Sequence, residues 1–234
     1  MPFLTDPVSS LTHLAGAVVA AVAGVALVRR AWPHRGRALA MGVFAASAVV
    51  LLLASATFHS MPTHTVVRTV TQRLDHAAIF VLIAGTFTPL HVVLFRGFMR
   101  WGVLALVWAA AAAGITVKTI YFASVPEGAG VVAYLAMGWF GAVSMWLIYR
   151  RWGARFVSPL VVGGLAYTAG AMCELTGEPV LIRGVVGSHE VFHIAVLAGL
   201  GCMWMFIRRI APGAPAGVRA VPAPVGASAH RAAA

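Results

Sequence analysis

Seven stretches of apolar residues, each close to the length that crosses a lipid bilayer, constrain the fold of this chain more than any other feature. A helix needs ~20 residues to span the hydrocarbon layer. The stretches are apolar throughout and lack the two-residue alternation of a membrane barrel strand. The sequence therefore predicts an all-α membrane protein, a bundle of seven transmembrane helices. These helices are expected at residues 11–28, 38–58, 75–95, 101–121, 131–149, 157–174 and 189–207.

Composition excludes a water-soluble domain and argues against a nucleic-acid-binding protein. Hydrophobic residues make up 61% of the 234 residues and charged residues only 10%, which is more apolar surface than a soluble domain buries. The formal net charge is +11, but the arginines form short clusters between apolar stretches and no continuous basic face. Membrane lipids are therefore the expected partners, with no nucleic acid.

The chain is predicted to contain one folded domain. Residues 1–210 hold all seven apolar stretches, whereas residues 211–234 are rich in Ala, Pro, Gly and Val. A segment of this composition has little to bury, so it is expected to be a disordered tail. The sequence makes no prediction about the oligomeric state.

Basic residues are distributed unevenly between the two ends of the predicted bundle. The end that holds the N-terminus carries four of the 17, namely Arg68, Arg73, Lys118 and Arg183, and the opposite end carries the other 13. Because Lys and Arg are retained in the cytoplasm during insertion, this count predicts an N-terminus outside and a C-terminus inside.

A few polar residues interrupt the apolar stretches where lipid should disfavour them. An ionisable side chain within a membrane span is costly and therefore indicates function. Residues four apart share one face of a helix, and two such pairs close the second stretch and open the seventh. The residues concerned, with two that open the third stretch, are Ser55, His59, Asp75, His76, His189 and His193.

The parity of the helices predicts that these residues meet. An even helix ends at the membrane face where the next odd helix begins, so the second, third and seventh helices present them at one face. Three neutral imidazoles near a carboxylate are typical of a zinc site with a fourth position open to water. We expect His59, His189 and His193 to bind zinc, which would lower the pKa of a water to ~7. The alternative is that these residues hydrogen-bond one another between helices without a metal.

Two further residues are candidates for catalysis beside this metal. Asp75 is predicted to orient or deprotonate the water, and Ser55 to hydrogen-bond a ligand, a carboxylate or a developing oxyanion.

The segment 189–193 also spells H-E-x-x-H, the signature of zinc metalloproteases, in which the glutamate acts as base. Such proteases take a third ligand from further along the chain. After Glu190 the sequence offers no Asp or Glu, and beyond His193 the one histidine is His230 in the tail. His59 is therefore the better third ligand, and the protease stays an alternative.

Several blocks of the sequence resemble the bacterial hemolysin III family, which belongs with the progestin and adipoQ receptors. The blocks occur in the family's order at residues 9–13, 55–59, 74–80, 84–89, 134–139 and 189–193. The resemblance implies a seven-helix fold in the bacterial inner membrane and zinc bound by His59, His189 and His193. It also implies that Ser55 and Asp75 surround the metal, and it assigns no role to Glu190.

The resemblance extends to function and to topology. The wider superfamily is similar to alkaline ceramidases, which implies a zinc-dependent hydrolase of membrane lipid amides. The alternative is a non-enzymatic sensor, a receptor-like protein or a cytolytic protein in which zinc is structural. Relatives among the adiponectin receptors imply a cytoplasmic N-terminus, opposite to the prediction from the basic residues, and the two orientations stay open.

Overall fold

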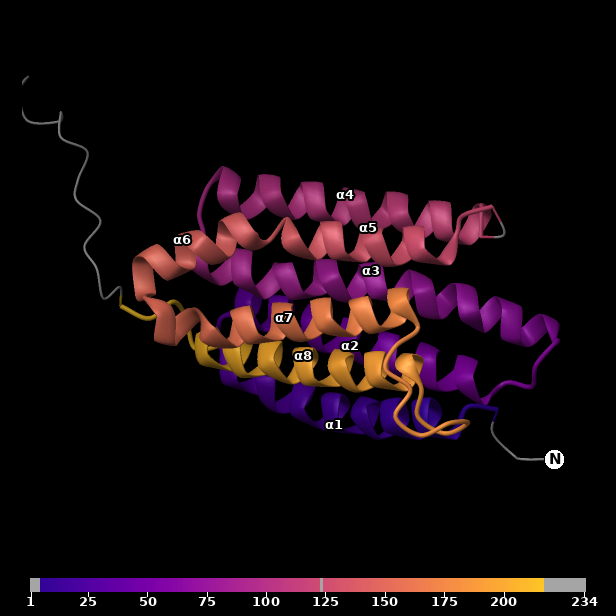
Figure 1. Cartoon of the computed structure of the whole chain (residues 1–234). Helices are drawn as coiled ribbons and strands as arrows, with labels where there is room; N and C mark the ends of the chain where they lie inside the picture. Colours follow the sequence, from indigo (N-terminus) through magenta and orange to yellow (C-terminus); the bar gives the residue numbers. More distant parts are fainter. Residues whose placement is uncertain (1–4, 123, 217–234) are drawn as a thin grey trace, which may run out of the picture.

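The computed structural model of the chain describes residues 5–122 and 124–216 (Figure 1). This part of the chain is helical, without any β-strand, and its turns include one isolated bridge between Ile182 and Val186. Residues 217–234, most of the predicted tail, lie outside the described residues. The helices are α1 (Pro7–Ala31), α2 (Arg35–Ser60), α3 (Val66–Leu94), α4 (Phe98–Ile120), α5 (Glu127–Trp139), α6 (Ala142–Trp152), α7 (Ala154–Thr176) and α8 (Ser188–Ile210).

These helices make seven apolar crossings, each 23 to 29 residues long. Helices α1 to α4, α7 and α8 each cross once, and α5 and α6 together make the crossing Gly128–Trp152. Each crossing is long enough for the hydrocarbon layer. The predicted fold class is confirmed: the protein is an all-α integral membrane protein with seven transmembrane segments.

The fifth crossing is broken near its middle, where one continuous helix was predicted. Phe140 and Gly141 separate α5 from α6, and Gly141 packs closely on α3. A Cβ atom added to Gly141 would lie 3.0 Å from the Phe87 ring and 3.1 Å from the carbonyl oxygen of Gly138. The residues on either side are apolar except for Ser144, so hydrophobicity alone gave no sign of this break.

Helix α3 begins nine residues before the predicted start at Asp75. The Thr65 side chain caps it by accepting a hydrogen bond from the backbone N–H of Arg68 at 3.2 Å, which satisfies one of the unpaired donors of the first turn. The added turns are polar, as expected of a helix that continues beyond the hydrocarbon layer. Asp75 therefore lies within a continuous helix and not at its end.

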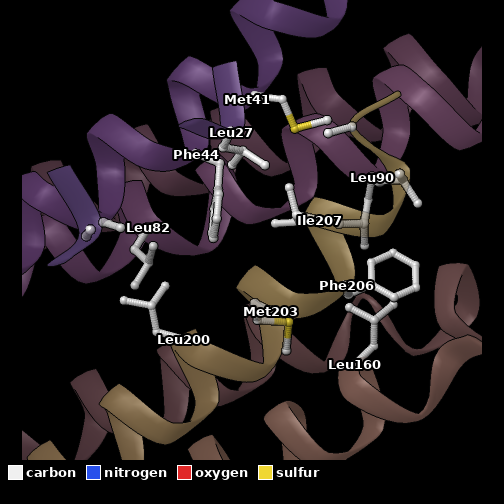
Figure 2. Packing of buried hydrophobic residues seen from close by; sticks show 14 of the residues in the cluster. Leu27, Met41, Phe44, Leu82, Leu90, Leu160, Leu200, Met203, Phe206 and Ile207 are labelled. Atoms are coloured by element: carbon white, nitrogen blue, oxygen red, sulfur yellow. The ribbon is translucent and has the colours of Figure 1, made fainter. Parts of the chain in front are cut away.

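The main buried core runs along most of the bundle, from Ala17 and Leu52 to Phe206 and Ile210. Large side chains from α2, α7 and α8, among them Phe44, Leu160 and Phe206, interlock there (Figure 2). Because lipid is as apolar as these side chains, close packing and not water exclusion stabilises such contacts. Leu160 and Met203 of this core also line the hollow that adjoins the histidines.

Helix α8, the last crossing, packs against the first helices of the bundle. It lies along α7 and also contacts α1 and α3. Gly163 of α7 allows the close approach to α8, since a Cβ atom there would lie 3.1 Å from the carbonyl oxygen of Gly199. The start of α8 thereby reaches the end of α2, as Figure 1 shows.

Candidate metal centre and adjoining cavity

Three imidazoles converge where α2 ends and α8 begins. His59 is the last residue but one of α2, and His189 and His193 occupy the first two turns of α8. The Nε2 atom of His189 lies 3.3 Å from Nε2 of His59 and 3.1 Å from Nε2 of His193. His59 and His193 are buried, and all three nitrogens lie within 4.8 Å of one another. The structure thus brings the three predicted ligands together.

Two carboxylates fix the proton positions on two of these rings. Nδ1 of His59 lies 3.0 Å from Oδ2 of Asp6, and Nδ1 of His189 lies 3.0 Å from Oε2 of Glu174. An ionised carboxylate only accepts hydrogen bonds, so each Nδ1 carries the proton. In the neutral rings Nε2 then bears a lone pair, and the two lone pairs face each other.

Lone pairs 3.3 Å apart repel unless positive charge lies between them. A proton can bridge one pair of nitrogens, whereas a metal ion can bridge all three. Tetrahedral zinc with Zn–N bonds of about 2.0–2.1 Å places its ligand nitrogens about 3.3 Å apart. The separations of the His189 nitrogen from those of His59 and His193 fit this geometry. Histidines that bind metal usually donate their other N–H to a carboxylate, as His59 and His189 do.

Asp6 is held in place by more than the imidazole. Its Oδ2 atom accepts a hydrogen bond from Nη2 of Arg68 at 2.8 Å, and its backbone N–H donates to the carbonyl oxygen of His59 at 3.0 Å. Burial alone would raise the pKa of Asp6, but the hydrogen bonds from Arg68 and His59 lower it below its ordinary value. Asp6 therefore stays ionised at neutral pH and keeps accepting from His59.

Ser55 and Asp75 lie beside the three histidines. Ser55 is one turn before His59 on the same face of α2 and is 1% exposed, and Asp75 on α3 is 8% exposed. The Ser55 hydroxyl lies next to the Asp75 carboxyl. Both line the same cavity as His59, so all five predicted site residues surround one space.

Glu190, the glutamate of the H-E-x-x-H segment, caps helix α8 and connects it to α1. Its Oε2 atom accepts a hydrogen bond from the backbone N–H of Gly187 at 2.9 Å, which completes the cap of α8. Its Oε1 atom accepts from the Ser9 hydroxyl at 3.2 Å. Both oxygens are thus engaged in joining α8 to its cap and to α1, which disfavours a role as the base of a protease.

Other polar residues, to which the sequence prediction assigned no role, also reach this region. The His13 ring stacks on the His193 ring, with centroids 4.1 Å apart. His76 lines the cavity, and its carbonyl oxygen accepts a hydrogen bond from the Tyr134 hydroxyl at 3.1 Å. Lys118 of α4 is buried and lines the same cavity.

Sequence reasoning missed the carboxylates of Asp6 and Glu174 and the guanidinium of Arg68. A usable signal was present, because the chain has only six acidic residues. Four of them, Asp6, Asp75, Glu174 and Glu190, line the cavity. In a chain so poor in acidic residues, each one that lies next to an apolar stretch is a candidate partner for the histidines.

The cavity has a volume of about 610 Å³ and runs from the histidines to the buried core. Leu160 and Met203, which belong to the core, also line its far end. Between α5 and α7 it reaches Trp139 and Leu165, which are 48% and 54% exposed. The cavity therefore extends from the polar site along an apolar wall to the outer surface of the bundle.

Comparison with known proteins places the chain in a family. A family model described as haemolysin-III related matches residues 1–204. The chain belongs to this family. The resemblance of the sequence blocks to hemolysin III proteins is thereby confirmed.

Two relatives of the haemolysin-III family show how far the similarity extends. Hemolysin-3 of Bacillus cereus is 31% identical over 201 residues, which covers 85% of this chain and 88% of that protein. A Hemolysin-3 homolog of Bacillus subtilis (strain 168) is 30% identical over 165 residues, or 70% of this chain and 74% of that protein. The matches therefore include most of the bundle.

Proposed function

We propose that this member of the haemolysin-III family binds zinc through His59, His189 and His193 and hydrolyses a membrane lipid, with lipid amides as the substrate class. The observation that carries the proposal is the convergence of three Nε2 atoms at 3.1 and 3.3 Å, with two of the rings held by carboxylates. Two rings whose lone pairs face each other need a cation, and three neutral histidines are a usual zinc ligand set.

Zinc at this position would supply a Lewis acid that polarises a carbonyl group and makes water nucleophilic near neutral pH. The chain itself supplies the proton transfers. Asp75 lies beside the histidines and is assigned as the general base, and the Ser55 hydroxyl orients its carboxyl group. Asp6 and Glu174 keep the Nε2 atoms of His59 and His189 unprotonated and aimed at the ion.

The adjoining cavity supports a lipid substrate. Its volume of about 610 Å³ falls within the ~300–1,000 Å³ that is common for small-molecule sites. Leu82, Leu160 and Val196 contribute apolar wall, which suits an acyl chain. Because the cavity reaches exposed residues between α5 and α7, a lipid can enter from the bilayer with its polar group directed toward the histidines. We propose the bacterial inner membrane as its location, which the bacterial origin of both compared relatives supports.

The test is hydrolysis by purified full-length protein in detergent. Incubation with ceramide and with other acyl lipids should release fatty acid. Release should vanish in His193→Ala, which removes a ligand, and in Asp75→Asn, which removes the base, while Asp75→Asn should still contain zinc. Undiminished release by Asp75→Asn would refute the role assigned to Asp75, and no release from any lipid by zinc-loaded wild type would refute the hydrolase.

A second candidate function is a non-enzymatic one in which zinc staples the helices together. It is favoured by the depth of the ligands, since His59 and His193 are 2% and 3% exposed and connect α2 with α8. The protein would then be a sensor, a receptor-like protein or a cytolytic protein, and the relative from Bacillus cereus carries the name Hemolysin-3. A staple predicts that His59→Ala lowers the melting temperature, that Asp75→Asn leaves it unchanged, and that no lipid is cleaved.

A further inference from the structure

Charge is segregated between the two ends of the bundle. The six acidic residues of the chain all fall, by sequence position, at the end that holds the histidines. The three ion pairs found among the described residues lie at that end too. The opposite end carries eleven of the described arginines and no acidic residue. They are Arg29, Arg30, Arg35, Arg37, Arg96, Arg100, Arg150, Arg151, Arg155, Arg208 and Arg209.

Four of these arginines share one surface depression of about 520 Å³. Arg35 and Arg37 reach it from the start of α2, Arg96 from the turn between α3 and α4, and Arg100 from the first turn of α4. The remaining wall comes from His34, Gly36, Val92, Val93, Gly213 and Ala214. Two segments distant in the sequence thus bring four like charges together, which is unfavourable unless an anion joins them.

The backbone holds two of the four guanidinium groups in place. Nη1 of Arg37 donates to the carbonyl oxygen of Pro212, and Nε of Arg100 donates to the carbonyl oxygen of Phe95 at 2.7 Å. Each bond uses one of the five N–H donors of a guanidinium group. The other donors can serve a phosphate group, for which the planar fork of arginine is well matched.

The walls of the depression indicate which kind of anion it takes. Val92 and Val93 extend it along the last turns of α3 toward the apolar part of that helix. Large apolar side chains close in sequence to Arg35 and Arg37 are also exposed, with Trp32 before α2 at 63% and Leu39 in α2 at 71%. A soluble anion would gain nothing from them, whereas a lipid would place its acyl chains there. Basic pockets of this kind at the membrane surface bind anionic headgroups.

We propose that the depression formed by Arg35, Arg37, Arg96 and Arg100 binds the phosphate-bearing headgroup of an anionic phospholipid from the adjacent leaflet. This lipid site is at the opposite end of the bundle from the histidines and is independent of the function proposed above. Its occupant ties together the start of α2, the start of α4 and the segment that follows α8.

The experiment measures lipid binding to the purified full-length protein by native mass spectrometry, with phosphatidylglycerol as the probe and zwitterionic phosphatidylcholine as the reference lipid. The pocket variant is Arg35→Gln with Arg96→Gln. Its matched control is Arg29→Gln with Arg155→Gln, which removes the same charge from the same face outside the depression. We expect the affinity for phosphatidylglycerol to fall roughly 10- to 30-fold in the pocket variant and less than about threefold in the control.

Each other outcome overturns the proposal. An equal loss in both variants would mean a diffuse surface charge effect, and no loss in either would mean that the depression does not bind the lipid. Displacement of the lipid by millimolar glycerol phosphate would assign the site to a soluble phosphate ester. Should the pocket variant fail to fold, Arg35→Lys with Arg96→Lys keeps the charge but loses the guanidinium fork. It is expected to weaken binding about threefold, and unchanged binding would again contradict the proposal.

Discussion

The variant Glu174→Gln tests how much the Glu174 carboxylate contributes to zinc binding by His189. In the structure Oε2 of Glu174 lies 3.0 Å from Nδ1 of His189 and holds the proton there. In Glu174→Gln the amide can present either its oxygen or its NH₂ group to Nδ1. The His189 ring is then free to carry its proton on Nε2, where it would block the metal. Asp6→Asn is a less clean change, because it also removes the carboxylate that forms an ion pair with Arg68.

The expected size of the effect follows from this geometry. Loss of a carboxylate that supports a metal-binding histidine typically weakens metal affinity about 10- to 100-fold, which corresponds to about 1.4 to 2.7 kcal/mol. His59 and His193 stay in place, so zinc should still bind, but less tightly. We therefore expect a dissociation constant for zinc that is raised within this range and a fold that is retained.

The assay is competition for zinc between the purified protein and a chromophoric chelator. Glu178→Gln is the matched control, since Glu178 is exposed in the turn after α7 and does not line the cavity. Both variants lose one negative charge at the same end of the bundle. Equal zinc affinity in the two variants would refute the argument that Glu174 sets the proton position on His189.

Three further predictions address the cavity, the cap and the ligand set. Gly164 lines the cavity and Gly201 does not, and a Cβ atom at either would meet nothing within 4 Å. Gly164→Leu should therefore reduce lipid hydrolysis at least tenfold while its zinc content stays unchanged. In the control Gly201→Leu, both hydrolysis and zinc content should stay unchanged. Glu190→Gln should retain zinc and hydrolysis, because Glu190 is not the base. Weakening of the α8 cap should lower its free energy of unfolding by about 1 kcal/mol, measured by chemical denaturation. Complete loss of hydrolysis would instead indicate that Glu190 is the base, as in H-E-x-x-H enzymes. His193→Ala should lose most of its zinc by elemental analysis, and full zinc occupancy in this variant would contradict its assignment as a ligand.

Hydrophobicity was sufficient to predict the crossings but not their irregularities. Seven apolar stretches predicted seven spans because lipid selects for length and apolarity, and the structure has them. The break at Phe140 and Gly141 arises from close packing of α5 and α6 on Phe87 of α3, which no local pattern records. Helix α3 starts early because Thr65 caps it within a polar segment. The predicted start was taken from the apolar stretch that follows, so this cap was not used.

The three histidines of the candidate site could be predicted from helix spacing and parity. Their carboxylate partners could not, because they are set by tertiary contacts. Helix spacing placed His189 and His193 on one face, and parity brought His59 to them. The partners of Nδ1 are different, because Asp6 is the N-cap residue of α1 and Glu174 lies near the end of α7, 53 and 15 residues from the histidines that they contact. Only their rarity in an apolar chain marks them, and that signal becomes useful once the histidine cluster has been identified.

X-ray absorption spectroscopy at the zinc edge, on protein purified without added metal, tests the central claim most directly. We predict about one zinc ion per chain with three nitrogen neighbours from imidazole at about 2.0–2.1 Å and one oxygen neighbour. The structure contains two free cysteines, Cys173 and Cys202. A sulfur neighbour at about 2.3 Å, or purified protein that contains no zinc, would contradict the assignment of His59, His189 and His193 as a zinc site.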